Sequence, residues 1–330
     1  MSIDRRRFLK GVLAGGAALA TLQTRPVEAR DNLTMPAKAM GLLYDSTLCI
    51  GCKACVAACK ESNHLPAEFS TEEQYWDSPL DLSGKTKNVI KVYKHGTAER
   101  KDQAENGYAF IKHSCLHCVD PSCVSACPVS AMLKDPVTGI VTYDEKACIG
   151  CRYCVVACPF DVPRFEYDTP FPKIVKCELC RHLQEKDHGT RFEYSACAQV
   201  CPTGATLYGP VTELMAEAKR RLTLKPGTDH SVPRGRIGAG DNQTAKAAAY
   251  VQQVYGEKEL GGTQVLKIAA VPMDKLGMRE LPERSFASVS ETMQHSMYGY
   301  LITPAVVLGG LVVAAKRSVH DDDPDADSRE

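Results

Sequence analysis

The sequence holds sixteen cysteines, a residue type whose thiolate binds soft metal ions, and all of them lie between Cys49 and Cys201. They form four runs, each of which begins with C-x2-C and ends with C-x3-C. The runs are Cys49, Cys52, Cys55 and Cys59; Cys115, Cys118, Cys123 and Cys127; Cys148, Cys151, Cys154 and Cys158; and Cys177, Cys180, Cys197 and Cys201. Proline follows the last cysteine of the last three runs, whereas Lys60 follows the first. The chain therefore repeats one cysteine motif four times.

Three chemistries use cysteines at such spacings. A [4Fe–4S] cluster takes three thiolates from one C-x2-C-x2-C loop, and in two-cluster ferredoxins the fourth cysteine, before proline, serves the neighbouring cluster. Structural zinc takes C-x2-C pairs but has no use for a third close cysteine. Disulfides are restricted in Cα spacing and direction, so three thiols within seven residues cannot all bridge well. The pattern predicts four [4Fe–4S] clusters, with a zinc-stabilised binding module that has no redox role as the alternative.

Several segments carry a resemblance to a known family. They are "LLYDSTLCIGCKACV", "KDQAENGYAFIKHSCLHCVDPSCVSACPVSAM", "KDPVTGIVTYDEKACIGCRYCVVACPFDVPRF", "ELMAEAKRRLTLKPG" and "YGEKELGGTQVL". The chain resembles the four-cluster iron–sulfur subunits of membrane-bound molybdenum oxidoreductases and nickel–iron hydrogenases. Within that group it is similar to the electron-transfer subunit of hydrogenase-2, a membrane-bound uptake enzyme.

The resemblance implies how the cysteines are shared, because the family pairs its first run with its fourth and its second with its third. The implied ligand sets are Cys49, Cys52, Cys55 and Cys201; Cys177, Cys180, Cys197 and Cys59; Cys115, Cys118, Cys123 and Cys158; and Cys148, Cys151, Cys154 and Cys127.

The resemblance also implies a function without bond chemistry. Electrons would pass through four clusters between the hydrogenase small subunit, which accompanies the large subunit, and an integral-membrane partner that reduces quinone. A periplasmic molybdenum oxidoreductase is the alternative partner. The sequence has no C-x-x-C-H haem motif and no G-x-G-x-x-G after a strand, and no cysteine is left for nickel, so we expect no catalytic residues. Lys+Arg and Asp+Glu both number 40, so nothing indicates nucleic-acid binding.

Histidines and basic residues lie close to the cysteine runs. We expect His113, His117 and His182 to be packed or exposed, because each cluster already has four thiolates. Basic side chains could tune cluster potentials or bind a partner, but such groups are more often solvated. These basic residues are Lys53, Lys60, Arg152, Arg164 and Lys176.

The N-terminus is typical of an export signal over residues 1–29. Arg5-Arg6 precedes Phe-Leu-Lys, an uncharged apolar run covers 11–22, and Val27-Glu28-Ala29 fits a cleavage site. The paired arginines indicate the twin-arginine route, which carries folded proteins and suits a chain whose clusters are inserted before export. A buried N-terminal helix is the alternative.

Near the other end, residues 298–315 carry no charge, begin at Tyr298 and precede Lys316-Arg317. We expect a single transmembrane anchor there, with the body on the periplasmic face of the inner membrane and the acidic tail, 316–330, in the cytoplasm. Pro304 and Gly309-Gly310 weaken the helix, and a buried core helix is the alternative.

The elements that must position the cysteines indicate an α+β fold. We expect two ferredoxin-like double-cluster units over 30–210, with an insertion at 61–110, and an extension over 211–297 that wraps around them. "GLLYD", "NVIKVYKH" and "GGTQVLKIAAV" are predicted strands. "VTELMAEAKRRLTLKPG" is a predicted helix that stops at Lys-Pro-Gly.

Overall fold

The structure is a computed structural model that describes residues 29–68, 78–170, 172–184 and 188–321. The predicted export signal, apart from Ala29, and most of the acidic tail therefore lie outside the described residues. The chain divides into two compact units: Asn32–Ala287, and Met1–Asp31 together with Ser288–Glu330. All sixteen cysteines belong to the first of these units.

Helices and short strands alternate along the chain. The helices are α2 (Ala54–Ser62), α3 (Ser122–Ser125), α4 (Tyr153–Ala157), α5 (Ala196–Gln199), α6 (Val211–Leu222) and α7 (Phe286–Asp321), with 3₁₀ turns at Arg181–Gln184 and Glu259–Gly261. The strands are β1 (Met40–Asp45), β2 (Asn88–Lys94), β3 (Arg100–Lys101), β4 (Gly107–Ser114), β5 (Met132–Lys134), β6 (Val141–Tyr143), β7 (Arg164–Phe165), β8 (Ile174–Val175), β9 (Thr206–Pro210), β10 (Asp229–Pro233), β11 (Gly235–Arg236), β12 (Asn242–Lys246) and β13 (Val265–Ile268). The four elements predicted from sequence are confirmed as β1, β2, α6 and β13.

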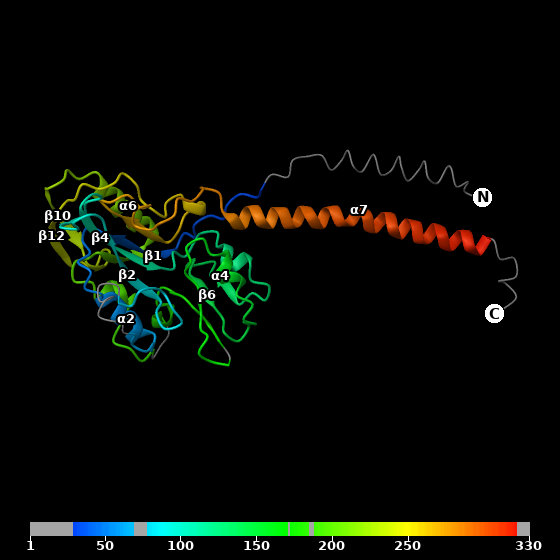
Figure 1. Cartoon of the computed structure of the whole chain (residues 1–330), viewed down its shortest axis with the longest axis horizontal. Coiled ribbons are helices and arrows are strands. Elements are labelled where there is room, and N and C mark those ends of the chain that lie inside the picture. Colours follow the sequence, from blue (N-terminus) through cyan, green and yellow to red (C-terminus); the bar gives the residue numbers. More distant parts are fainter. Residues whose placement is uncertain (1–28, 69–77, 171, 185–187, 322–330) are drawn as a thin grey trace. The chain divides into compact units, whose positions relative to one another are not determined.

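A four-stranded sheet in the order β11-β9-β1-β13 forms the centre of the first unit (Figure 1). β1 pairs antiparallel with β9 and parallel with β13, so segments about 220 residues apart in sequence lie side by side. The extension after residue 210 thus supplies both outer strands of the sheet, β11 and β13.

The two faces of this sheet bury different side chains, as the alternation along a strand requires. Leu42 and Tyr44 of β1 belong to the large core that also contains Cys49 and Cys55. Leu43, between them, packs on the other side with Leu214 of α6. The amphipathic helix α6 therefore covers one face, and the other face supports the cysteine-rich body.

The two C-x2-C-x2-C loops are built alike. Gly51 and Gly150 both have φ +70°, and the residues that precede the following helices, Lys53 and Arg152, are also left-handed. Each loop leads directly into a short helix, α2 or α4, which carries the third cysteine. These helices lie in different parts of the unit, since α2 packs beside β2 and α5 whereas α4 packs beside α3 (Figure 1). Internal repetition in the sequence thus becomes repetition in structure.

The predicted transmembrane helix over 298–315 is wrong. Those residues lie inside the 36-residue helix α7. Among the described residues, the structure contains no helix with the length and apolar character needed to cross a membrane. Pro304 lies inside α7, where proline weakens a helix, and the turns on either side of the apolar run are polar. We therefore no longer predict a membrane anchor at 298–315. The cytoplasmic position of the tail depended on that anchor and is no longer predicted either.

Candidate iron–sulfur sites

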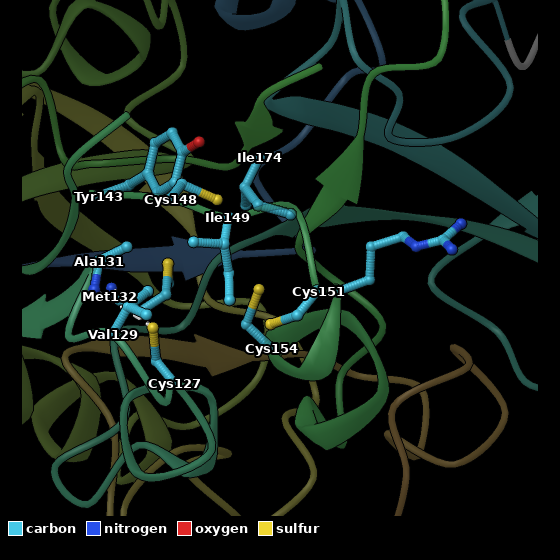
Figure 2. A pocket seen from close by; sticks show the side chains of 11 residues that line it. Cys127, Val129, Ala131, Met132, Tyr143, Cys148, Ile149, Cys151, Cys154 and Ile174 are labelled. Carbon is cyan, nitrogen blue, oxygen red and sulfur yellow. Dashed lines mark hydrogen bonds between the residues drawn. The ribbon is translucent and has the colours of Figure 1, made fainter. Parts of the chain in front are cut away.

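One pocket is lined by four cysteines, which we call site D: Cys127, Cys148, Cys151 and Cys154. Figure 2 shows Cys127 reaching this pocket from a different segment of the chain than the other three. It follows α3, whereas the others lie on the loop and first turn of α4. The last cysteine of the second run therefore joins three from the third run.

Backbone amides point at the sulfurs of site D. The Gly150 N–H donates to Cys148 Sγ at 3.4 Å, and the Ala131 N–H donates to Cys127 Sγ at 3.2 Å. Figure 2 marks hydrogen bonds among the lining residues with dashed lines. Amide donors stabilise the negative charge of a thiolate and raise the reduction potential of a bound cluster. The donor set therefore fits a thiolate-ligated cluster.

A second pocket, site A, has the same design and is lined by Cys49, Cys52, Cys55 and Cys201. The Gly51 N–H lies 3.5 Å from Cys49 Sγ, in the position that Gly150 takes in site D. The Thr206 N–H donates to Cys201 Sγ at 3.4 Å. Here three cysteines of the first run meet the last cysteine of the fourth.

The remaining thiols form two interior groups. Site B comprises Cys59, Cys177, Cys180 and Cys197, and site C comprises Cys115, Cys118, Cys123 and Cys158. Burial, reinforced by neighbouring thiolates of the same group, raises the pKa of Cys59, Cys177 and Cys180 to about 12. Burial raises the pKa of Cys118 as well, with Cys158 as its strongest charged neighbour. Thiolates packed this way need a cationic partner, which iron supplies.

The four thiols of site A and the four of site D each line one pocket, and those of sites B and C are electrostatic neighbours within each predicted set. Among the described residues, no three of the predicted ligand side chains already stand at metal-binding geometry. Their individual roles as cluster ligands remain a prediction. Sites A and D lie near the surface: Ile50 and Ile149, at equivalent positions beside these pockets, are 56% and 65% exposed.

The basic residues near the runs differ in exposure: Lys60 and Lys176 are buried, Lys53 and Arg164 are half-buried, and Arg152 is exposed as expected. Lys60 is buried, and its Nζ bonds Glu68 Oε2 at 3.0 Å. Lys176 is also buried and donates to the carbonyls of Val141 and Cys177. Arg152 lies over the Phe165 ring, 5.4 Å from its centroid.

The sequence interpretation missed three further lysines that lie inside the body. Lys134 donates to the Cys118 carbonyl at 2.9 Å, and Lys112 and Lys267 are almost completely buried. The available signal was a lysine in an otherwise apolar strand, as in "YAFIKHS" and "QVLKIAAV".

His113, His117 and His182 each have a side-chain hydrogen-bond partner in the protein, although Nε2 of His117 has none among the described residues. His117 is fully buried, and its Nδ1 accepts the Val141 N–H at 3.0 Å. Nε2 of His113 lies 3.0 Å from the Phe160 carbonyl oxygen, and burial lowers the pKa of His113 to about 4. Nε2 of His182 lies 3.0 Å from Ser62 Oγ.

Alanine substitutions at the two loop glycines are expected to differ in effect. Both residues have φ +70°, a conformation that costs a residue with a side chain about 1–2 kcal/mol. A Cβ on Gly51 would also lie 2.4 Å from the Phe110 ring, whereas one on Gly150 would meet nothing closer than 3.6 Å. Gly51→Ala should therefore lose iron from site A at lower denaturant concentration than Gly150→Ala loses it from site D. Equal sensitivity of the two variants would contradict this.

Comparison with known proteins identifies the class of site. Residues 48–131 and 107–211 each match a model of a 4Fe-4S dicluster domain. The chain is therefore an iron–sulfur redox protein, and two dicluster domains with sixteen cysteines correspond to four [4Fe–4S] clusters. This fits the amide-lined thiol pockets described above and leaves the zinc alternative without support.

Sequence identity with known proteins shows to which family of iron–sulfur proteins the chain belongs. The chain is 45% identical over 325 residues to the hydrogenase-2 operon protein HybA of Escherichia coli O157:H7, covering 98% of both chains. It is 32% identical to the iron–sulfur subunit of the nitrate-inducible formate dehydrogenase of Escherichia coli K12, covering 74% of this chain and 71% of that one. It is 33% identical to the formate dehydrogenase-O iron–sulfur subunit of the same strain, covering 81% and 77%. The chain belongs to the HybA family of iron–sulfur electron-transfer subunits.

Proposed function

We propose that this chain is the electron-transfer subunit of a nickel–iron hydrogenase and carries out no bond chemistry itself. The observation that carries the proposal is the match to hydrogenase-2 operon protein HybA over 98% of both chains. The match includes the four cysteine runs, which the fold gathers into sites A to D.

The arrangement of the sites supports a linear path. Thiols of different sites are close enough to affect one another electrostatically: Cys55 with Cys197, Cys177 with Cys115, and Cys123 with Cys154. These contacts join A to B, B to C and C to D. A bound [4Fe–4S] cluster accepts and releases one electron at a time. The chain's own residues hold the sites close together and bring A and D near the surface.

We assign one redox partner to each end of this electron path. Electrons would enter from the hydrogenase small subunit, beside its large subunit, and leave to an integral-membrane subunit that reduces quinone. The formate dehydrogenase relatives make a molybdenum enzyme the second candidate, with lower identity and coverage.

Metal analysis tests the cofactor content. Protein isolated without oxygen should contain about sixteen irons and sixteen acid-labile sulfides per chain, at four of each per site. Zinc at one ion per four cysteines with little sulfide would overturn the electron-transfer function.

Reduction by a partner tests the hydrogenase assignment. Under hydrogen, a catalytic amount of the cognate hydrogenase heterodimer should bleach the visible absorption of the oxidised chain. Formate with a formate dehydrogenase catalytic subunit serves as the matched comparison. Faster bleaching with formate would transfer the assignment to the molybdenum enzyme.

We also place the folded chain on the periplasmic face of the inner membrane, exported by its twin-arginine signal. Arg5→Lys with Arg6→Lys should leave the uncleaved precursor in the cytoplasm, because this route requires the arginine pair. Lys38→Arg, which lies after the signal, is the control and should leave export unchanged. Cell fractionation and immunoblotting measure the result, and normal export of the double variant would contradict the proposal.

A further inference from the structure

Lys112, in β4, carries an ammonium group that is buried without an acidic partner. The residue is 1% exposed, and its Nζ donates a long hydrogen bond, 3.5 Å, to Thr206 Oγ1. No carboxylate in the described part of the chain forms an ion pair with it. A buried charge in this situation is strongly unfavourable unless some other negative group compensates it.

The β-sheet register places this ammonium at the wall of site A. Lys112 lies directly opposite Ile90 of β2, and opposite residues in an antiparallel pair present their side chains on the same face. Ile90 and Thr206 both line the pocket of site A. The Thr206 amide donates to Cys201 Sγ, so one residue contacts both the lysine and a site A thiol.

Thiols of two sites are the charged neighbours of the same ammonium. They are Cys197 and Cys177 of site B and Cys55 of site A. The buried ammonium of Lys112 therefore lies beside the thiols of sites A and B.

Lys267 shows what happens to a lysine buried without thiols. Its Nζ donates to the Lys112 carbonyl at 2.8 Å and lies 3.2 Å from Met278 Sδ. Burial, together with the charge of Lys112, lowers the pKa of Lys267 to about 7. Of these two buried lysines, only Lys112 has cysteines as its charged neighbours.

We propose that Lys112 is a shared counter-charge that raises the midpoint potentials of the clusters in sites A and B. Reduction adds one negative charge to a site, and a fixed ammonium beside it stabilises that added charge. This proposal rests on the proposed function and adds to it a residue that sets the midpoint potentials of two sites along the electron path.

Potentiometric titration of the full chain, followed by electron paramagnetic resonance, tests the proposal. Lys112→Met keeps an unbranched side chain, one atom shorter, and removes its charge, and Lys112→Arg keeps the charge. Lys91→Met, on the neighbouring strand, removes a lysine that is 37% exposed and paired with Asp81. We expect two of the four potentials to become more negative in Lys112→Met, and all four to stay near those of the unchanged protein in the other two variants.

Each result of these measurements either supports or contradicts the proposed role of Lys112. Unchanged potentials in a Lys112→Met protein that holds all its iron would overturn the proposal. Loss of about eight irons from Lys112→Met, with full content in Lys112→Arg, would support it, since two sites then need the charge to bind their clusters. If both variants lose iron alike, shape and not charge is required, and the proposal falls. None of these results depends on which enzyme supplies electrons, so the proposed function is tested separately by hydrogen-driven bleaching.

Discussion

Cys123→Ala and Cys127→Ala are expected to empty different sites although the two residues are only four positions apart. Cys127 lines the pocket of site D with three cysteines of the next run, whereas Cys123 is grouped electrostatically with Cys115 and Cys158 in site C. Each variant should fall from about sixteen irons to about twelve, because a cube that loses one thiolate ligand is no longer held by four. Either loss should also stop electron transfer through the chain, since the sites form a single path.

Double variants make this test specific. Cys127→Ala with Cys148→Ala removes two ligands of the same site and should cost no more iron than either change alone. Cys127→Ala with Cys123→Ala removes ligands of two sites and should leave about eight irons. Iron losses that do not add show that two cysteines serve the same site, and iron losses that add show that they serve different sites. If Cys127→Ala with Cys123→Ala loses only one cluster, the second run binds its own cluster and the predicted sharing is wrong.

Local sequence determines the cysteine loops almost completely. The C-x2-C-x2-C spacing forces a tight loop whose third position is left-handed, and Gly51 and Gly150 supply it. Which run exchanges its fourth cysteine with which other run cannot be deduced from spacing, because it depends on how distant segments pack. It came from the family resemblance, and the fold brings the corresponding thiols together.

The sequence alone does not predict which distant strands pair or which charged side chains are buried. β1 and β13 were each predictable as strands, but nothing local indicates that they lie side by side in parallel. Lys112 was missed for a related reason: a charge in a strand suggests a solvent-facing position unless both faces of the strand are known to be covered. The wrong prediction over residues 298–315 is of the opposite kind, because an uncharged run indicated a span whereas no described helix is long and apolar enough to be one.

The second large effect is expected from Arg221, which joins the C-terminal extension to the central sheet. Its Nη1 lies 2.9 Å from Asp45 Oδ2 and its Nε lies 2.8 Å from Glu217 Oε1, with Arg221 and Asp45 fully buried. The Tyr250 hydroxyl also donates to Asp45 Oδ2, at 2.7 Å. Arg221→Met would leave the Asp45 carboxylate buried without its cation, a change that costs about 3–5 kcal/mol of unfolding free energy.

Arg220 provides the matched control, since it contacts the same Glu217 from a side chain that is 41% exposed. Arg220→Met should cost less than about 1 kcal/mol, as exposed ion pairs do. Urea unfolding monitored by circular dichroism gives both values, and Asp45→Asn added to Arg221→Met should recover part of the loss by removing the stranded charge. Because Asp45 ends β1 four residues before Cys49, site A should release iron early in Arg221→Met. Equal, small effects of the two arginine substitutions would mean that the extension is held by apolar packing of α6 alone, and that the buried network adds nothing to the stability of the sheet.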